Sequence, residues 1–390
     1  MNRTADVIIV GGGVTGLSTA LQLRERGVER VTVLERDYVG AAQSGRAAGV
    51  ARVLVADPRV AQWQLDAQRF FSGFTERFGV PVEVHRHGYL LVARAEDEAR
   101  VLRSVEVARQ VGVDARRIDA AEALEVQLGV RQDDSCIYVF ESGALYVDPM
   151  PVTHALATAA RSRGVDICEA CDVREVLVDG DQVTGVRTAA GDHPAPSVMI
   201  ATSVWGRAQL ERMRIDVPVY PHRAEMGFFH APLGSSHQLS CILSDVEACL
   251  YLRPEGERQM FVGWREGDLV DGPDDYIAED PDRYRQTALP ERVHDMHARL
   301  AAALPFMKDG FVHRTYACVY DYTPDGQPIL DADGPRGLYY ALGFSGGGFS
   351  SAPTVGRTMA QFIVDEKKPE ELHWLRRSRF EDGELITWSN

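Results

Sequence analysis

Three glycines near the start of the chain have the spacing G-x-G-x-x-G: Gly11, Gly13 and Gly16. They follow the apolar, β-branched run 7–10, which predicts a short buried strand, and they open a helical pattern that ends at Gly27. In such a unit the first glycine permits a sharp turn, the second lets main chain approach a pyrophosphate, and the third lets the helix pack closely on the strand. The N–H groups at the start of the helix would face the phosphates. The unit therefore predicts a dinucleotide-binding site.

An acidic residue, Glu35, follows the second predicted strand, 31–34. A carboxylate at this place accepts hydrogen bonds from an adenosine ribose and repels a 2′-phosphate, so NADP is disfavoured. The glycine motif and Glu35 do not distinguish FAD from NAD. Both cofactors stay open on these residues alone.

Positive charge in this chain is carried almost entirely by arginine. Among 42 basic residues the lysines are Lys308, Lys367 and Lys368. A lysine that forms a Schiff base or holds an ammonium over a cofactor is therefore hard to place. Arg46 and Arg52 lie in one loop after the second predicted strand. A guanidinium is the usual bidentate partner of a carboxylate or a phosphate, so arginine is expected to supply the charge at the site.

Composition excludes several other classes of protein. Apolar residues make up 45% of the 390 residues, enough for a large core and two or three domains, and the net charge of −15 disfavours nucleic acid and anionic membranes as partners. Glycines interrupt the apolar N-terminal stretch, so no membrane span is expected. The six cysteines form no disulfide framework and no secretory signal precedes the first strand, which favours the cytoplasm.

Two further site types are disfavoured by the spacing of their residues. Cys168 and Cys171 form a C-E-A-C pair, but no second pair with suitable spacing accompanies them, so a turn between two strands is predicted and no metal site. A serine-hydrolase nucleophile elbow is not expected either, although residues 343–347 of the glycine loop spell G-x-S-x-G.

Hydrophobic periodicity predicts the elements that must position these residues. Helices are expected at 58–78, 96–110 and 149–163, with helical segments at 280–304 that are interrupted at Pro290. Strands are expected at 165–169, 172–179, 182–188 and 197–201, and nearly throughout 217–264 with turns at 232–234 and 254–256. The stretch 338–364 predicts a strand, a glycine loop and a helix, so the chain begins and ends in α/β units around a β-rich insertion.

Several longer motifs occur in a fixed order over nearly the whole chain. They are GGGVTGLSTA, SGRAAGVAR, GALYVDP, YLRPEGERQMFVGW, CVYDYTPDGQPIL, GFSGGGFSSAPTVGR and SRFEDG. In content and order they resemble the D-amino-acid-oxidase-like (DAO) flavoproteins, in the branch of sarcosine oxidase, the sarcosine oxidase β subunit and glycine oxidase. The resemblance implies FAD as the cofactor. It also implies oxidation of an amino acid or N-alkylated amino acid, a sarcosine- or glycine-like amine, to the imine by hydride transfer to flavin N5, with reoxidation by O2 or another acceptor.

The resemblance also implies an α/β fold with an α+β substrate domain. A Rossmann-like FAD-binding domain is expected at 1–80, 145–210 and 311–390, interleaved with a β-sheet substrate-binding domain at 81–144 and 211–310. The alternating strand and helix patterns at both ends of the chain agree with this division.

Four residues match catalytic positions of the similar enzymes: Arg52, Tyr251, Tyr320 and Gly346. Arg52 matches the arginine that similar oxidases place over the flavin, where it would bind a substrate carboxylate, and the two tyrosines would line the site. Gly346 belongs to the glycine loop 343–348. The N–H groups of that loop and the helix that follows would place a positive field beside flavin N1 and the C2 carbonyl.

The residues expected to bind the cofactor lie in the two glycine motifs and the segments beside them. They are Gly11, Gly13, Val14, Thr15, Gly16, Glu35, Arg36, Ser44, Gly45, Arg46, Val173, Cys318, Gly343, Ser345, Gly346, Gly347, Gly348, Phe349 and Ser350.

Two positions depart from the pattern of the monomeric sarcosine oxidases. Phe261 stands where those enzymes place a lysine for oxygen activation, and Ser350 stands where they place a second carboxylate-binding lysine. Oxygen reactivity and strict sarcosine specificity are therefore not expected to carry over. The chain is either a dehydrogenase with another electron acceptor, or an oxidase whose positive field comes from elsewhere, for example from His222 or Arg265.

Cys318 matches the cysteine that monomeric sarcosine oxidase bonds to the 8α carbon of its flavin. A thiolate is nucleophilic enough for that bond. Many similar chains carry a small residue at this place and bind FAD noncovalently, and buried cysteine is common in protein cores. Covalent and noncovalent attachment both stay open.

Two other functions are compatible with the same N-terminal unit. One is an NAD-dependent dehydrogenase, and the other is a non-catalytic flavin-binding subunit of a multi-subunit amine dehydrogenase. A small-molecule amine is the expected substrate, and a partner subunit or a homo-oligomer stays open.

Overall fold

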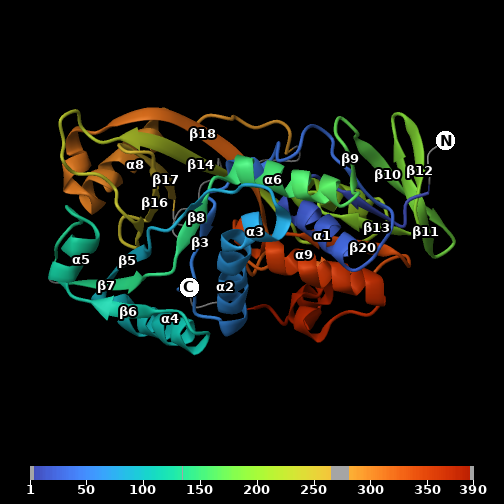
Figure 1. Cartoon of the computed structure of the whole chain (residues 1–390), viewed down its shortest axis with the longest axis horizontal. Helices are drawn as coiled ribbons and strands as arrows, with labels where there is room; N and C mark the ends of the chain where they lie inside the picture. Colours follow the sequence, from blue (N-terminus) through green and yellow to red (C-terminus); the bar gives the residue numbers. More distant parts are fainter. Residues whose placement is uncertain (1–3, 134, 265–280, 387–390) are drawn as a thin grey trace.

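The computed structural model describes residues 4–133, 135–264 and 281–386. Two large sheets occupy the two halves of an elongated molecule, with helices α1, α2 and α9 between or beside them (Figure 1). The helices are α1 (Val14–Glu25), α2 (Pro58–Ser72), α3 (Phe74–Phe78), α4 (Glu98–Gln110), α5 (Ala120–Val126), α6 (Pro149–Ser162), α7 (Gly206–Glu211), α8 (Pro290–Ala303) and α9 (Gly348–Asp365).

A six-stranded sheet contains the first strand of the chain. In spatial order its strands are β19 (Ile329–Asp331), β20 (Leu338–Leu342), β13 (Ser197–Ile200), β1 (Val7–Val10), β2 (Val31–Leu34) and β9 (Asp166–Cys168). All neighbours run parallel except β19, which is antiparallel to β20. Strand β1 is buried along its whole length because both faces of the sheet are covered, which is why it is continuously apolar.

The two faces of this sheet are covered by different layers. On one face Val7 and Ile9 pack with side chains of α1, α6 and α9. On the other face Ile8 and Val10 pack against a three-stranded sheet of β10 (Val173–Asp179), β11 (Gln182–Thr188) and β12 (Gly191–Pro194). The result is a helix–sheet–sheet arrangement around β1, with the N-termini of α1 and α9 at the same side of the sheet.

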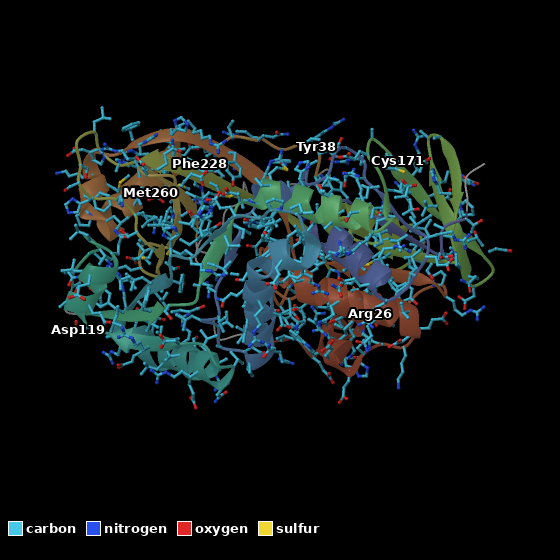
Figure 2. All side chains as sticks on the ribbon, in the orientation of Figure 1. Arg26, Tyr38, Asp119, Cys171, Phe228 and Met260 are labelled. Atoms are coloured by element: carbon cyan, nitrogen blue, oxygen red, sulfur yellow. The ribbon has the colours of Figure 1, made fainter. Side chains whose placement is uncertain are left out.

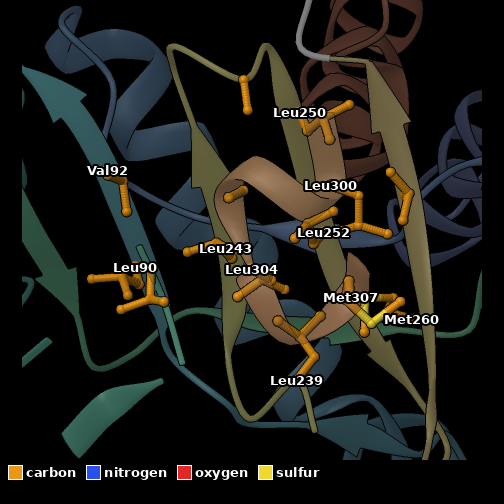
Figure 3. Close-up of a cluster of buried hydrophobic side chains, with 14 of the residues drawn as sticks. Leu90, Val92, Leu239, Leu243, Leu250, Leu252, Met260, Leu300, Leu304 and Met307 are labelled. Atoms are coloured by element: carbon orange, nitrogen blue, oxygen red, sulfur yellow. The ribbon is translucent and has the colours of Figure 1, made fainter. Parts of the chain in front are cut away.

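An eight-stranded, mostly antiparallel sheet forms the other half of the molecule. In spatial order its strands are β18 (Phe311–Tyr322), β14 (Tyr220–His230), β17 (Gln259–Trp264), β16 (Leu250–Glu255), β15 (Ile242–Asp245), β5 (Tyr89–Arg94), β7 (Cys136–Glu141) and β6 (Ala115–Ile118). One face carries Leu90, Leu243, Leu252 and Met260 and packs on α8 and the turn after it, as Figure 3 shows. Residues in the alternate positions point to the opposite face and are available for a site.

Short elements connect the two halves. Strands β3 (Val50–Ala51), β8 (Leu145–Val147) and β4 (Val84–His85) form a small sheet near the centre of the molecule. Helix α2 packs beside this sheet, where Gln68 donates to the Ala51 carbonyl oxygen at 3.2 Å. Asp57 caps the start of α2 by accepting hydrogen bonds from the Arg59 and Val60 amides at 2.7 and 3.4 Å, and Pro58 takes the first helical position.

Most predicted elements are confirmed, and four differ. The strand predicted nearly throughout 217–264 is interrupted, because residues 231–241 between β14 and β15 form no strand. The helix predicted at 58–78 is broken at Gly73 into α2 and α3. The helical prediction is wrong over 281–289, because Pro290 is the first residue of α8, where its missing N–H costs nothing. The turn predicted at 254–256 begins later, because Pro254 still pairs with Met260 in the β16–β17 hairpin. A proline is tolerated there because β15, the other neighbour of β16, pairs only with residues 250–252.

One strand joins a different sheet from the one suggested by its position in the chain. β18 pairs with β14 along its length and belongs to the eight-stranded sheet, although the sequence groups 311–390 with the cofactor-binding segments. Phe228 and Met260 of the eight-stranded sheet lie in one half of the molecule and Cys171 in the other (Figure 2). The described residues include no helix long and apolar enough to cross a membrane.

The C-E-A-C pair lies in the predicted context. Cys168 ends β9 and Cys171 lies just before β10, and the backbone between them turns through Ala170 at φ +54°. Both thiols are free, and the described part of the chain has no cluster of three metal-ligating side chains.

Candidate active site

A cavity of about 1110 Å³ is lined by residues of both large sheets. Val10 and Leu34 come from the six-stranded sheet, and Tyr89, Ile242 and Tyr251 from the eight-stranded one. The volume exceeds the range of about 300–1,000 Å³ that is usual for small-molecule pockets. The cavity is thus large enough for a cofactor and a second molecule.

The first glycine motif forms a turn in which side chains have no room. Gly11 has φ +112°, and a Cβ there would lie 2.4 Å from the carbonyl oxygen of Ala201. A Cβ on Gly13 would lie 2.9 Å from Ser44 Oγ, and one on Gly16 would lie 2.1 Å from the carbonyl oxygen of Gly11. Gly11 and Gly13 line the cavity, whereas Gly16 allows the helix to rest on the strand.

Helix α1 points its N-terminus at the cavity. Val14 and Thr15 line the cavity, and the Val14 amide donates to Ser44 Oγ at 3.0 Å. The amides of the first helical turn have no acceptor within their own helix, and the helix dipole makes this end positive. The end of α1 is therefore suited to an anionic group such as a pyrophosphate.

Glu35 lines the cavity at the end of β2. Its Oε2 accepts a hydrogen bond from the Gly12 amide at 2.7 Å and its Oε1 accepts one from the Asp37 amide at 2.9 Å. Burial raises the pKa of Glu35, and these two amides act against the rise. The carboxylate is held at the glycine turn, where it is placed to accept from ribose hydroxyls.

The two arginines predicted near the cofactor have protein partners. Arg36 donates to both carboxylate oxygens of Asp282 at 2.9 and 3.0 Å, and Asp282 Oδ1 also accepts from Trp205 Nε1 at 3.0 Å. Arg46 Nη1 donates to the Ala41 carbonyl oxygen at 2.5 Å. Both arginines line the cavity, but the charge of Arg36 is balanced by Asp282.

The second glycine loop joins β20 to α9 and is held by β18. The Gly343 amide donates to Asp321 Oδ2 at 2.8 Å, and the Ser345 amide donates to the Asp321 carbonyl oxygen at 3.0 Å. Gly343, Ser345 and Gly346 have positive φ angles of 74°, 48° and 85°. This path leads directly into α9 at Gly348, so a second helix N-terminus lies at the cavity.

Asp321 connects the two sheets at this loop. It lies on β18, its side chain is buried, and burial raises its pKa to about 6 while the Gly343 amide opposes the rise. Thr323 continues the connection, because its amide donates to Ser345 Oγ at 3.1 Å. The conformation of the glycine loop is therefore set by the end of a strand from the other sheet.

Arg52 lies against the eight-stranded sheet. Its guanidinium lies 5.2 Å from the centre of the Tyr89 ring, and its Nη1 donates to the Leu54 carbonyl oxygen at 2.5 Å. Arg36 and Arg100, two other arginines of the cavity lining, pair with Asp282 and Asp97. Arg52 forms no ion pair with any residue that the structure describes, so its charge is available to a ligand.

Glu141 holds the main chain beside Arg52. It ends β7 with no exposed surface and accepts hydrogen bonds from the Val53 amide at 2.8 Å, the Leu54 amide at 3.0 Å and Gln68 Nε2 at 2.8 Å. Burial raises the pKa of Glu141, while the hydrogen bonds and the charge of Arg52 oppose the rise. A buried acid that is fixed by three donors gives the Arg52 loop a defined position.

Aromatic residues form part of the sheet wall. Tyr320 on β18 and His222 on β14 are direct cross-strand partners, and both line the cavity. Tyr251 also lines it and occupies the space over Gly263, where a Cβ would lie 2.3 Å from Tyr251 Cζ. The predicted tyrosines therefore lie on the same cavity wall, on strands far apart in the sequence. Arg265 lies outside the described residues.

The two positions that depart from the sarcosine oxidase pattern lie in different surroundings. Phe261 is fully buried beside Phe228 and Tyr251 and does not line the cavity. Ser350 lines it from the first turn of α9. Neither position 261 nor position 350 carries a cationic side chain in this protein.

Most residues predicted for the site meet at this one cavity. Those that line it are Gly11, Gly13, Val14, Thr15, Glu35, Arg36, Ser44, Arg46, Arg52, Val173, Tyr251, Tyr320, Ser345, Gly346, Gly347, Gly348, Phe349 and Ser350. Four lie outside the lining: Gly16, Gly45, Gly343 and Cys318. The three glycines allow close packing, since a Cβ on any of them would come within 2.4 Å of a neighbouring atom. Cys318 is buried with Met226, Phe228 and Phe261.

Sequence reasoning missed several residues that organise the site. Asp321 stands inside the quoted CVYDYTPDGQPIL motif, so its position was a usable signal. Glu141 and Asp282 carry no such signal, because their partners are 73 or more positions away in the chain.

The model of the DAO family, described as FAD-dependent oxidoreductase, matches residues 6–362. The chain belongs to this family. It is 27% identical over 397 residues to the sarcosine oxidase subunit beta of Arthrobacter sp, which covers 98% of this chain and 93% of the relative. Two solved structures share its fold at 23% identity. The L-proline dehydrogenase from P. horikoshii has a TM-score of 0.88 over 99% of this chain and 100% of its own. The glycine oxidase from Geobacillus kaustophilus has a TM-score of 0.80 over 96% and 98%.

Family membership decides the cofactor in favour of FAD over NAD. The residues present fit this group: two helix N-termini face the cavity, Glu35 is held at the first of them, and Cβ atoms on Gly11 and Gly13 would collide with neighbouring atoms. Val14, Thr15 and Glu35 would hold the adenosine and pyrophosphate part, and loop 345–348 would face the isoalloxazine.

Proposed function

We propose that this FAD-dependent oxidoreductase oxidises an amino acid or N-alkylated amino acid to the imine. The hydride is removed from the carbon beside the substrate nitrogen. The observation that carries the proposal is Arg52, a cavity arginine without an ion-pair partner in the described chain. The named relatives support it, because sarcosine, L-proline and glycine all combine an amine with a carboxylate one carbon away.

Each part of the cavity has a role in this proposal. Arg52 binds the substrate carboxylate, and Glu141 keeps the Arg52 loop in place. Tyr251 and Tyr320 form the wall that orients the amine. FAD, when bound, accepts a hydride at N5. The amides of loop 345–348 and the N-terminus of α9 favour negative charge at the adjacent ring edge.

The proposed electron acceptor for the reduced flavin is a compound other than O2. Phe261 is apolar and buried at the position of the oxygen-activating lysine, which supports an acceptor other than O2. The relative from Arthrobacter sp is named as a subunit, which supports assembly with a partner or with further copies of this chain. None of the six cysteines forms a disulfide, which supports a reducing compartment such as the cytoplasm.

Anaerobic reduction of the bound flavin tests the function whatever the acceptor. The purified protein is mixed with amino acids that carry primary, secondary or tertiary amines, and bleaching of the flavin absorbance is followed. We expect at least one of these compounds to bleach it with the chain alone. A chain that binds FAD and is bleached by none of them would instead be the non-catalytic subunit. Air-exposed turnover then separates an oxidase from a dehydrogenase.

A further inference from the structure

The cavity extends past Arg52 into a part that we call the apolar lobe. It is lined by Leu54, Val60, Leu91, Val101, Ser104 and Ile242. These residues come from the segment before α2, from α2 itself, from α4 and from strands β5 and β15. None of them belongs to the glycine motifs or to the segment around Glu35.

Strand pairing places the apolar lobe next to Arg52. Ile242 is the direct cross-strand partner of Tyr89, whose ring lies beneath the Arg52 guanidinium, and Leu91 lies two residues along the same strand. Side chains two apart on a strand share a face. A molecule whose carboxylate is bound by Arg52 therefore has the apolar lobe within direct reach.

Polar residues also line the cavity beside the apolar lobe: Gln64 on α2, and Ser244, which is the cross-strand partner of Leu91 and donates to the Leu250 carbonyl oxygen at 3.4 Å. Arg100 lines the cavity from α4, but its guanidinium is paired with Asp97 at 2.6 Å. The Ser104 hydroxyl donates to the Arg100 carbonyl oxygen of its own helix at 3.3 Å. Leu91, Val101 and Ile242 are at most 6% exposed, so a bound group would be removed from water.

We propose that the substrate carries an apolar group of several carbons, on the α-carbon or on the nitrogen, that lodges in the apolar lobe. This inference rests on the proposed function, because it assumes that Arg52 binds the carboxylate. Glycine and sarcosine would leave the apolar lobe empty. Each methylene that enters it would tighten binding roughly fourfold.

Unreactive straight-chain carboxylates test the apolar lobe separately from the chemistry. Acetate, butyrate and hexanoate are titrated into the FAD-loaded protein, and the shift of the flavin absorbance gives each Kd. We expect Kd to fall by about two orders of magnitude from acetate to hexanoate. Equal Kd values along the series would overturn the inference. If no amine bleaches the flavin but the Kd series is steep, the proposed function fails while the apolar lobe is retained.

A pair of variants at one position provides the matched control. Ser104→Leu adds apolar volume inside the apolar lobe, whereas Ser104→Ala removes the hydroxyl and adds none. We expect Ser104→Leu to weaken hexanoate binding at least tenfold relative to acetate binding, and Ser104→Ala to keep the preference for hexanoate over acetate. Wild-type FAD content and melting temperature establish that each variant is folded. If Ser104→Leu does not fold, Val101→Ala replaces it and is expected to weaken hexanoate binding only.

The same series with reactive compounds identifies the substrate class. Under anaerobic conditions, norleucine and N-butylglycine are compared with glycine and sarcosine for the rate of flavin bleaching at low concentration. We expect the compounds with four-carbon groups to react at least tenfold faster. A higher rate with glycine or sarcosine would contradict the inference.

Discussion

The cavity wall beside the six-stranded sheet presents main-chain groups at glycine turns and helix N-termini, whereas the wall beside the eight-stranded sheet presents arginine and tyrosine side chains. The first wall includes two glycine turns, two helix N-termini and the Glu35 carboxylate. The second has Arg52, Tyr89, Tyr251 and Tyr320, carried by segments far apart in the sequence. Main-chain groups bind what every family member shares, and exchangeable side chains are suited to what differs among members.

The largest expected effect is at Gly16, whose nearest neighbour is a main-chain oxygen. Gly16→Ala would place a methyl group 2.1 Å from the Gly11 carbonyl oxygen, which neither strand β1 nor helix α1 can accommodate. We expect the free energy of unfolding to fall by about 3 kcal/mol, together with loss of FAD. Gly73→Ala is the control, because its nearest atom is 3.4 Å away, and it should change stability by less than about 0.5 kcal/mol. Normal FAD retention in Gly16→Ala would refute this view of the wall.

Asp321 is the residue that joins the two walls, and it should give stability a pH dependence. Its pKa is raised to about 6 from 3.8, so the folded protein binds a proton that the unfolded chain has released between these values. Its contribution to stability is therefore full below pH 3.8 and is lost as pH rises to about 6, by up to roughly 3 kcal/mol.

Asp321→Asn keeps an acceptor for the Gly343 amide and removes the titration. In urea unfolding curves between pH 4 and pH 7, the stability of the wild type minus that of Asp321→Asn should fall up to pH 6 and then stay level. A difference that is constant across this range would show that Asp321 does not titrate there.

On the wall beside the eight-stranded sheet, loss of the Arg52 side chain should weaken substrate binding and leave FAD binding unchanged. Arg52→Ala removes a cavity arginine that is available to a carboxylate, so substrate Kd should rise at least about thirtyfold while flavin content stays normal. Arg52→Lys keeps the charge and should recover part of the affinity. Loss of FAD from Arg52→Ala would place this arginine at the cofactor instead.

Glu35 lies on the wall beside the six-stranded sheet, and its loss should have the reverse effect, weakening FAD binding and sparing substrate binding. Glu35→Ala removes a charged acceptor from the ribose and should weaken FAD binding by about 1.5 kcal/mol, with no change in substrate Kd for the protein that retains FAD. Equilibrium dialysis measures the first and absorbance titration the second. Unchanged FAD affinity in a folded variant would remove Glu35 from the cofactor site.

The smallest effect is expected at Cys318. This thiol is buried with Met226, Phe228 and Phe261 and lies outside the cavity lining, so we expect FAD to be bound noncovalently. After acid precipitation the yellow colour should stay in the supernatant, for the wild type and for Cys318→Ser alike. A yellow pellet from the wild type that turns white in Cys318→Ser would establish a covalent bond.

The predictions that were accurate concern contacts between near neighbours in the chain. Strand β1, its glycine turn and α1 occupy consecutive residues, and their steric requirements restrict the residue types directly. Errors arose where a local signal was ambiguous. Pro290 starts a helix rather than interrupting one. Pro254 lies within the β16–β17 hairpin, because on its other side β16 pairs with β15 only through residues 250–252.

The sequence by itself determined the glycine turns, the acid at the end of β2 and the order of motifs that marks the FAD-dependent oxidoreductases, because each depends on the conformation of a few consecutive residues. Only the tertiary structure decided that Asp321 holds the second glycine loop, that Glu141 fixes the Arg52 loop and that the apolar lobe adjoins Arg52. These contacts join residues about 20 to about 190 positions apart, and their geometry follows from how the two sheets pair and pack, which no local spacing encodes.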